Sequence, residues 1–257
     1  FPETALVSKV YASETGYAVE VTPGGFDNTI TMMVGVDKAG SVLGISIISH
    51  IASIGTVEDS RFDPMNPVLP DTNPDFPVLD AAKGQQMLES IAAAREEQDS
   101  IGGTVECAIL GVPAGLGDPM FDGIESRIAQ ILFGVPAVKA VEFGAGFALA
   151  DMKGSDANDP FRMEEGKVVT DTNNSGGING GITNGMPIVF RTAVKPTPTI
   201  FKSQNTVDFG NMTDALLKPK GRHDPAIVHR ARIVQDAATA IVLCDCLALR
   251  FGTDWLR

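Results

Sequence analysis

Strand-like and helix-like segments follow one another along this chain without a regular β-α-β alternation. Apolar and β-branched residues with strand character occupy residues 29–36, 42–49, 105–110, 138–143 and 188–194. Helical periodicity follows Asp80, Asp122 and Pro225. An irregular mixture of this kind is typical of an α+β fold. We therefore expect layers of antiparallel strands and helices.

The N-terminal region, residues 7–54, has the pattern of strands, and part of it predicts a β-hairpin. Strand-like residues 29–36 are followed by the turn-forming residues 37–40, Asp-Lys-Ala-Gly, and then by strand-like residues 42–49. Residues 62–77 follow and contain five prolines. Because proline continues neither a strand ladder nor a helix, we expect an irregular connection there.

Three segments carry helix signals. Asp80 precedes a helical stretch, and Asp122 is expected to cap a second helix that ends at Gly134. Pro225 is expected to occupy the first position of a final helix that reaches about Arg250. The apolar positions of this last helix form a broad face, so we expect most of it to be buried.

Composition limits the possible partners. The chain has 257 residues, of which 44% are hydrophobic, and a formal net charge of −12. This length is sufficient for one large domain or two small ones. The negative charge argues against nucleic acid, since little would neutralise the phosphates. A small anionic substrate would require a site that gathers its own cations against the overall field.

The three cysteines, Cys107, Cys244 and Cys246, favour buried free thiols in a reducing cytoplasm over a disulfide or a metal site. Residues 1–4 have neither a basic start nor an apolar run, so we expect no signal peptide. The longest hydrophobic region, residues 29–55, is interrupted by charges and glycines, and we expect no membrane-spanning helix.

A loop rich in glycine and asparagine occupies residues 173–185. Glycines such as Gly180 let main-chain amides approach a ligand closely and tolerate positive φ angles. A flexible loop without a ligand is an equally good interpretation of the composition. The spacing does not match the Gly-x-Gly-x-x-Gly dinucleotide pattern.

Two further segments combine cations with a stiff main chain. Residues 195–199, Lys-Pro-Thr-Pro-Thr, directly follow a strand, and they suit either a phosphate or flavin edge or an ordinary rigid turn. Residues 218–232 contain five cations and one acidic residue in an otherwise acidic chain, as a site for an anionic ligand would require. Asp224, just before Pro225, is also a good helix N-cap. His50 lies in a strand pattern, which favours a structural role.

Six ordered motifs, read together, resemble chorismate synthase, most clearly between about Ser90 and Arg250. They are residues 97–103 (EQDSIGG), 111–122 (GVPAGLGDPMFD), 137–144 (AVKAVEFG), 173–185 (NNSGGINGGITNG), 195–197 (KPT) and 221–225 (GRHDP). The resemblance implies a lyase that needs reduced FMN and converts 5-enolpyruvylshikimate 3-phosphate to chorismate and phosphate. It also implies a homotetramer that acts in the shikimate pathway.

The resemblance implies roles for individual residues. Gly180, Lys195, Pro196, Thr197, Pro198, Thr199 and Arg222 would contact FMN. Ala137 would reach the flavin of a neighbouring subunit, while Asp224, Arg222 and His223 are the catalytic candidates. Asp224 would assist proton transfer at the flavin N5, a suitable task for a carboxylate beside an arginine. We expect Arg222, Lys195 and the glycine-rich amides to form one cationic pocket, and we expect no metal site.

The resemblance does not extend to the start of the chain. The Gly-Glu-Ser-His-Gly motif of the family and its second histidine motif do not occur, and residues 1–49 contain no histidine. Residues of about 6–50 instead resemble part of the FMN-binding domain of flavoprotein subunits of Rnf-type electron-transfer complexes. We therefore expect two parts, 1–50 and 51–257, in a truncated, impaired enzyme. An FMN-binding electron-transfer module and a non-catalytic fusion of two partial domains are the alternatives.

Overall fold

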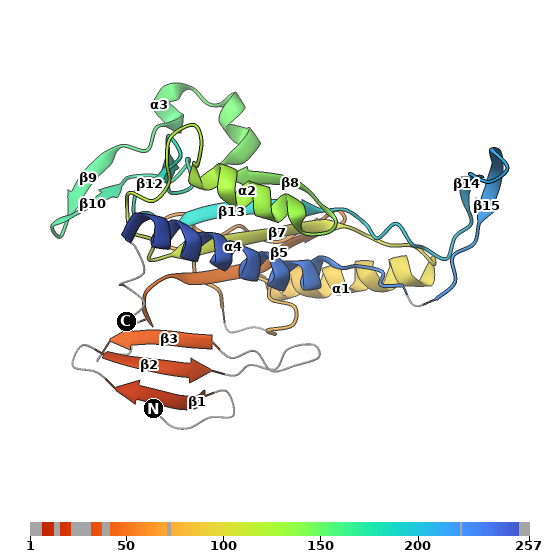
Figure 1. Cartoon of the computed structure of the whole chain (residues 1–257), viewed down its shortest axis with the longest axis horizontal. Coiled ribbons are helices and arrows are strands. Elements are labelled where there is room, and N and C mark those ends of the chain that lie inside the picture. Colours follow the sequence, from red (N-terminus) through yellow and green to blue (C-terminus); the bar gives the residue numbers. More distant parts are fainter. Residues whose placement is uncertain are drawn as a thin grey trace.

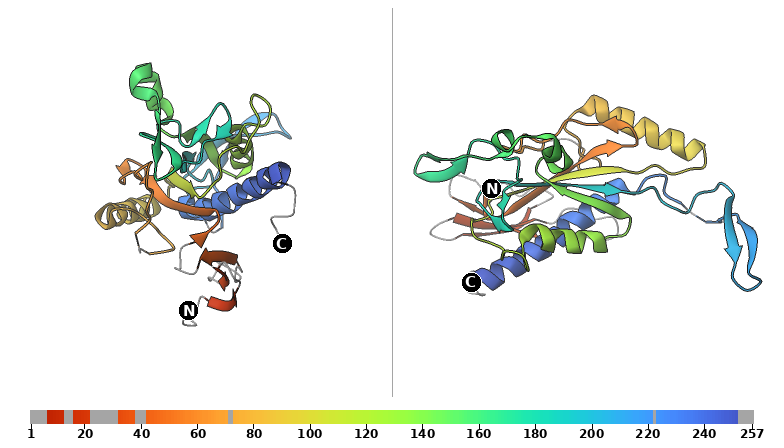
Figure 2. Two further views of the ribbon diagram at one scale, coloured as in Figure 1. Left: turned by 90° about the vertical axis from the view of Figure 1, so that its left-hand side faces the viewer. Right: turned by 90° about the horizontal axis from the view of Figure 1, so that it is seen from above.

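The computed structural model describes residues 7–12, 16–21, 32–37, 42–70, 73–221 and 223–251, with side chains described from Gly44 onward. Figures 1 and 2 show an elongated body built around one sheet, with a smaller N-terminal sheet below it and a hairpin that projects from one end.

The central sheet has five strands in the order β6-β5-β7-β13-β8, and all neighbours are antiparallel. The strands are β5 (Ser46–Ile54), β6 (Val57–Glu58), β7 (Gly103–Leu110), β8 (Val138–Phe143) and β13 (Ile188–Val194). Together with the helices, this antiparallel sheet confirms the α+β prediction.

Alternate residues of the strands face two different layers. On one face, residues such as Cys107 and Phe190 pack against helices α1 (Ala81–Glu96), α2 (Ile124–Gly134) and α4 (Val228–Phe251) in two apolar clusters. On the other face, Ala108 and Val189 pack against Phe62 of the proline-rich segment. The described residues of segment 62–77 form no helix or strand, as the prolines predict.

The N-terminal strands form a four-stranded antiparallel sheet in the order β1-β2-β3-β4. They are β1 (Val7–Ala12), β2 (Gly16–Val21), β3 (Met32–Asp37) and β4 (Val42–Leu43). The expected hairpin pairs β3 with β4, but the prediction of one strand over residues 42–49 is wrong. Gly44, with a φ of 119°, ends β4, and the chain then enters β5 of the central sheet.

The starts of two helices test the capping predictions. Asp80 caps α1 as expected, because its carboxylate accepts hydrogen bonds from the amides of Ala82 and Lys83. Asp122 does not cap α2: Gly123 holds that position and makes no side-chain bond. The main chain of Asp122 instead pairs with Asp118, which keeps its side chain away from the cap.

The last helix begins three residues later than predicted. The carbonyl of Pro225 accepts a hydrogen bond from the amide of Ile101 at 2.7 Å, and Ile227 provides the first carbonyl for the amides of Arg230 and Ala231. Pro225 is therefore tied to a loop and does not open α4. The expectation of a mostly buried helix is also only partly right, since Val234 is 51% exposed and Ile241 is 64% exposed.

Short elements complete the chain. They are η1 (Gly146–Asp151), α3 (Gly154–Ala157), β9 (Phe161–Glu164), β10 (Lys167–Thr170), β11 (Ile178–Asn179), β12 (Ile182–Thr183), β14 (Gln204–Asp208) and β15 (Thr213–Leu217). Among the described residues, none of the helices combines the length and apolar character that crossing a membrane requires. Cys107 and Cys246 are buried free thiols, whereas Cys244 is exposed, contrary to expectation.

Candidate functional site

The loop of residues 97–101 joins two of the three segments that the sequence marks as functional. The Ser100 hydroxyl donates to the carbonyl of Thr197 at 2.6 Å, and the amide of Phe201 donates to the carbonyl of Gln98 at 3.1 Å. The amide of Ile101 donates a hydrogen bond to the carbonyl of Pro225 and so holds residues 223–225 to the loop. Residues 195–201 and 223–225 therefore lie on either side of one loop, which the sequence did not identify as their support.

Ala137 belongs to the same end of the sheet. Its carbonyl accepts a hydrogen bond from the amide of Lys195 at 2.9 Å, and its φ is 73°. A positive φ is uncommon for alanine, and Gln98 in the loop described above has a φ of 59°. Such conformations cost free energy, and two of the five described non-glycine residues with positive φ lie at this end of the sheet.

Two buried polar atoms at this end have no hydrogen-bond partner in the described part of the chain. They are Oγ1 of Thr197 and Nε2 of His223. The ring of His223 packs edge-on against Phe201, with 4.6 Å between ring centroids. A buried polar atom without a partner carries a desolvation cost that a ligand can remove. Lys195, Pro196, Pro198 and Thr199 are exposed beside them.

The Asp224 carboxylate forms an ion pair with the guanidinium of Arg230, with 2.6 Å between Oδ2 and Nη1. Both side chains are partly exposed. Asp224 is therefore oriented by the first turn of α4 and is not its N-cap. Arg222 lies outside the described residues, and its predicted role stays a prediction.

Gly180 lies at the opposite end of the sheet. It is in the turn between β11 and β12, has a φ of 59° and has open space where a side chain would be. The neighbouring Gly181 accepts a hydrogen bond from the amide of Ile124 at the start of α2. The glycine loop precedes β13 and Lys195 follows it, so roughly 20 Å of strand separates the two. Within one chain, Gly180 and Lys195 therefore lie apart, and the pocket expected around Arg222, which lies outside the described residues, stays a prediction.

The hollows at the Lys195 end are limited. A small one of about 20 Å³ is lined by Arg95, Gln98, Asp99, Thr199, Ile200, Phe201, His223 and Pro225. An open groove of about 560 Å³ adjoins it between α1 and Pro225 and is lined largely by apolar side chains. The small hollow has space for about one water-sized group. It can take part of a phosphate but not a ring system.

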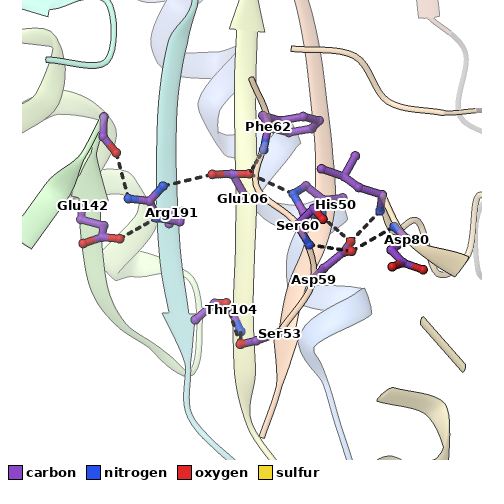
Figure 3. A network of polar contacts seen from close by, with 12 residues as sticks. His50, Ser53, Asp59, Ser60, Phe62, Asp80, Thr104, Glu106, Glu142 and Arg191 are labelled. Carbon is purple, nitrogen blue, oxygen red and sulfur yellow. Dashed lines mark hydrogen bonds and ion pairs between the residues drawn. The ribbon is translucent and has the colours of Figure 1, made fainter. Parts of the chain in front are cut away.

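A second polar system, buried on the opposite face of the sheet, was missed by sequence reasoning (Figure 3). Glu106 accepts hydrogen bonds from His50 at 3.0 Å, from the amide of Phe62 at 2.7 Å and from Arg191 at 3.0 Å. Burial raises the pKa of Glu106, but these donors outweigh burial and leave its pKa below the ordinary value. Its signal in the sequence was a charged residue in the middle of an apolar strand.

This network extends to both sides of Glu106. His50 is fully buried and lies 3.2 Å from a carboxylate oxygen of Asp59. Arg191 donates to Glu142 at 2.5 Å and to the carbonyl of Gly144 at 2.8 Å. His50, Asp59 and Glu106 are buried and Glu142 is 26% exposed, and the arrangement ties strands β5, β7, β13 and β8 together.

A third polar cluster lies between α4 and the sheet. Asp236 accepts a hydrogen bond from the Ser49 hydroxyl at 2.5 Å and lies 3.5 Å from Arg232. Burial raises the pKa of Asp236 to about 6, although Ser49 and Arg232 oppose the shift. Burial and the neighbouring Asp236 raise the pKa of the Cys107 thiol well above its ordinary value, so this thiol is neutral and unreactive.

We expect the replacement Asp236→Asn to remove a pH dependence of stability. Between about pH 4 and pH 6 the unfolded chain releases the Asp236 proton while the folded chain keeps it. The free energy of unfolding should therefore fall as pH rises through this window, by roughly 2–3 kcal/mol. Urea unfolding at pH 4 and pH 7 would measure this fall. The difference between wild type and variant should change with pH, and a constant difference would contradict the assignment.

The sequence model described as chorismate synthase matches residues 29–248, which is most of the chain. The chain belongs to the chorismate synthase family. A chorismate synthase of Thermococcus gammatolerans is 48% identical over 207 residues, and one of Dehalococcoides mccartyi is 46% identical over 217 residues. A crystal structure of chorismate synthase matches with a TM-score of 0.64 and 32% identity.

The coverage of these matches is unequal. The alignments include 80% and 84% of this chain but only 57% and 59% of the two relatives, and 58% of the crystallised chorismate synthase. The chain thus spans less than two-thirds of the chorismate synthases it matches. The family match begins at residue 29, and β5 runs unbroken through residues 50 and 51. The expected division of the chain near residue 50 stays a prediction.

Proposed function

We propose that this chain is an FMN-dependent lyase of the chorismate synthase type, with the flavin phosphate held at the end of β13. The observation that carries the proposal is the pair of buried, unpartnered atoms, Thr197 Oγ1 and His223 Nε2, beside the exposed cation Lys195. A hydroxyl, an imidazole and an ammonium group suit a phosphate, and the two prolines keep them in place.

The proposed reaction is the 1,4-anti elimination of phosphate from 5-enolpyruvylshikimate 3-phosphate, which yields chorismate. Reduced FMN would supply electron density as the allylic phosphate leaves. Asp224 would take part in proton transfer at the flavin N5, oriented by its ion pair with Arg230. Arg222 would add a bidentate contact to the phosphate. By likeness to the family, Ala137 would approach the flavin of a neighbouring subunit in a homotetramer.

The fit of FMN to one chain is partial. The donors at the end of β13 suit the phosphate group, whereas the 20 Å³ hollow beside them excludes the isoalloxazine ring. The ring would have to lie outside this hollow, for example over the adjoining groove beside α1. We therefore propose weak FMN binding by a single chain, with the phosphate as the main recognised group.

A titration of the full chain with FMN and with riboflavin, followed by flavin fluorescence, tests this proposal. FMN should bind and riboflavin, which lacks the phosphate, should not. Arg222→Ala should weaken FMN binding by about 10–100-fold, the value of a hydrogen bond to a charged group. Asp224→Ala should leave FMN affinity nearly unchanged, because the carboxylate is not a phosphate ligand.

The matched control is Arg162→Ala, an arginine on the β9–β10 hairpin that pairs with Glu164 and Asp171. It removes the same charge far from the candidate site and should leave affinity unchanged. Equal binding of FMN and riboflavin, or equal weakening by both arginine variants, would count against phosphate recognition at this end of the sheet.

We also propose that the chain by itself is an impaired enzyme, since the histidine motifs that the family resemblance leads us to expect are absent from its 257 residues. The alternative function, an FMN-binding electron-transfer module, depends on the Rnf-like pattern of residues 6–50. Side chains before Gly44 are outside the described set, so that resemblance stays a prediction.

A further inference from the structure

Arg95, in the last turn of α1, is a cation that none of the sequence motifs includes. It lines both hollows at the Lys195 end of the molecule, the small one beside His223 and the open groove between α1 and Pro225. Only Arg95 and Pro225 line both of them. The Arg95 side chain therefore lies where the two hollows adjoin.

Within the described part of the chain, the Arg95 side chain is exposed and forms no ion pair or hydrogen bond. Two other cations of this region are engaged. Lys202 pairs with Asp99 at 2.6 Å, and Arg230 pairs with Asp224 at 2.6 Å. A guanidinium group without a carboxylate partner keeps its fork of N–H donors available for a ligand.

The same pairs neutralise the acidic residues next to the small hollow. Asp99 is the carboxylate in its lining, and the hydrogen bond with Lys202 lowers the pKa of Asp99. Glu96 lines the open groove instead. An anion in the small hollow therefore meets Arg95 without an unpaired carboxylate in the described lining.

The small hollow also contains a buried group that lacks a partner among the described residues. Nε2 of His223 makes no hydrogen bond, and its ring is held edge-on by Phe201. Thr199 adds an exposed hydroxyl to the lining. A guanidinium, an imidazole and a hydroxyl thus border a space for about one water-sized group. This donor set matches an oxygen of a terminal phosphate.

The open groove supplies an apolar surface beside this hollow. It has a volume of about 560 Å³, and Leu88, Ile91, Ala92 and Pro225 form most of its lining. Leu88 is 43% exposed, so a ligand can reach it from solvent. Pockets of roughly this size hold small organic molecules. An apolar body can therefore lie along α1 while an anionic end enters the hollow.

We propose that Arg95 is an anion ligand of this site, which accepts phosphate esters with a planar apolar body. The Arg95 guanidinium binds the phosphate at the mouth of the small hollow, and the body of the ligand lies in the groove beside α1. This inference rests on the proposed function, which places the FMN phosphate at the same end of β13. It adds a ligand residue from outside the motifs and a ligand class broader than flavins.

Calorimetric titration of the full chain with naphthyl phosphate tests the site without a flavin. Wild type should bind this ester at least about tenfold more tightly than inorganic phosphate, which lacks the apolar body. Naphthol, which lacks the charge, should bind more weakly as well. Arg95→Ala should weaken the binding of naphthyl phosphate by about 10–100-fold, the value of hydrogen bonds to a charged group. Arg95→Lys should recover part of this loss, because it keeps the charge but not the fork of donors.

Lys83→Ala is the matched control, because it also removes one cation from α1 but at the first turn. From Lys83 to Arg95 the helix rises about 18 Å, so one phosphate cannot contact both. The Lys83 variant should bind naphthyl phosphate as wild type does. Equal weakening by Arg95→Ala and Lys83→Ala would show that overall charge attracts the anion, and this would overturn the proposal.

A second variant tests the groove. Leu88→Gln places a polar side chain in the apolar lining and should weaken the binding of naphthyl phosphate while leaving inorganic phosphate unchanged. Both Arg95 and Leu88 are exposed, so the urea midpoints of their variants should stay at the wild-type value. Unchanged affinity of Leu88→Gln for naphthyl phosphate would overturn the assignment of the groove.

FMN in the same titrations separates this inference from the proposed function. If naphthyl phosphate binds in an Arg95-dependent manner and FMN does not bind, the proposed function fails and the Arg95 site stands. If FMN binds but Arg95→Ala changes neither affinity, the proposed function stands and Arg95 is not a ligand. Binding of FMN without binding of naphthyl phosphate would overturn the broader ligand class, and binding of neither would overturn both proposals.

Discussion

On the proposed function, phosphate release from 5-enolpyruvylshikimate 3-phosphate by the purified 257-residue chain should be at least about 10⁴-fold slower than by a related chorismate synthase, because the two histidine motifs that the family resemblance leads us to expect do not occur in these residues and each general acid–base group is worth roughly 10²–10⁴. The chain has three histidines, His50, His223 and His229. His50 is fully buried, and burial lowers the pKa of His229 below its ordinary value. His50 is therefore closed to a substrate, and the proposed function assigns His223 to the flavin phosphate.

The assay uses reduced FMN in excess under anaerobic conditions, with the Thermococcus gammatolerans chorismate synthase, 48% identical, as the positive control. Excess FMN compensates for weak FMN binding but not for a slow chemical step. The assay therefore distinguishes these two defects. A rate within tenfold of the control at saturating FMN would contradict the prediction and would show that residues of this chain supply the missing protons.

The replacement Glu106→Gln should destabilise the fold by about 3–5 kcal/mol, the cost of breaking a buried ion pair by removing one charge. Glu106 is 1% exposed and holds both His50 and Arg191 (Figure 3). The glutamine would keep the shape of the side chain but leave the guanidinium with Glu142 as its remaining charged partner among the described residues. Urea unfolding should show a lower midpoint with an unchanged m-value.

The control is Glu164→Gln, which also removes a carboxylate from an arginine pair but on the exposed hairpin β9–β10, where Glu164 is 55% exposed. Its effect should be below about 1 kcal/mol, as for surface pairs in general. The double variant Glu106→Gln/Arg191→Met should be less destabilised than the sum of the single variants. Equal midpoints for Glu106→Gln and Glu164→Gln would mean that solvent reaches the network.

The sequence by itself determined the fold class, the long strands and helices of the central body, and the family. Strand and helix periodicities predicted β7, β8, β13 and the body of α1, because these signals are local and repeat every two or 3.6 residues. The cap at Asp80 was predictable for the same reason, since a capping side chain bonds amides two and three residues away. The order of the motifs along the chain was sufficient to indicate chorismate synthase.

Tertiary structure decided what depends on groups far apart in the chain. The bond between Ile101 and Pro225 sets the start of α4, and Asp118 takes the main chain of Asp122 away from the cap of α2. The partners of Glu106 come from residues 50, 62 and 191, and no short pattern announces them. Gly180 and Lys195 are fifteen positions apart and lie at opposite ends of β13. An extended strand holds the segments before and after it far apart in space. The spacing of the two residues in the sequence does not reveal this distance.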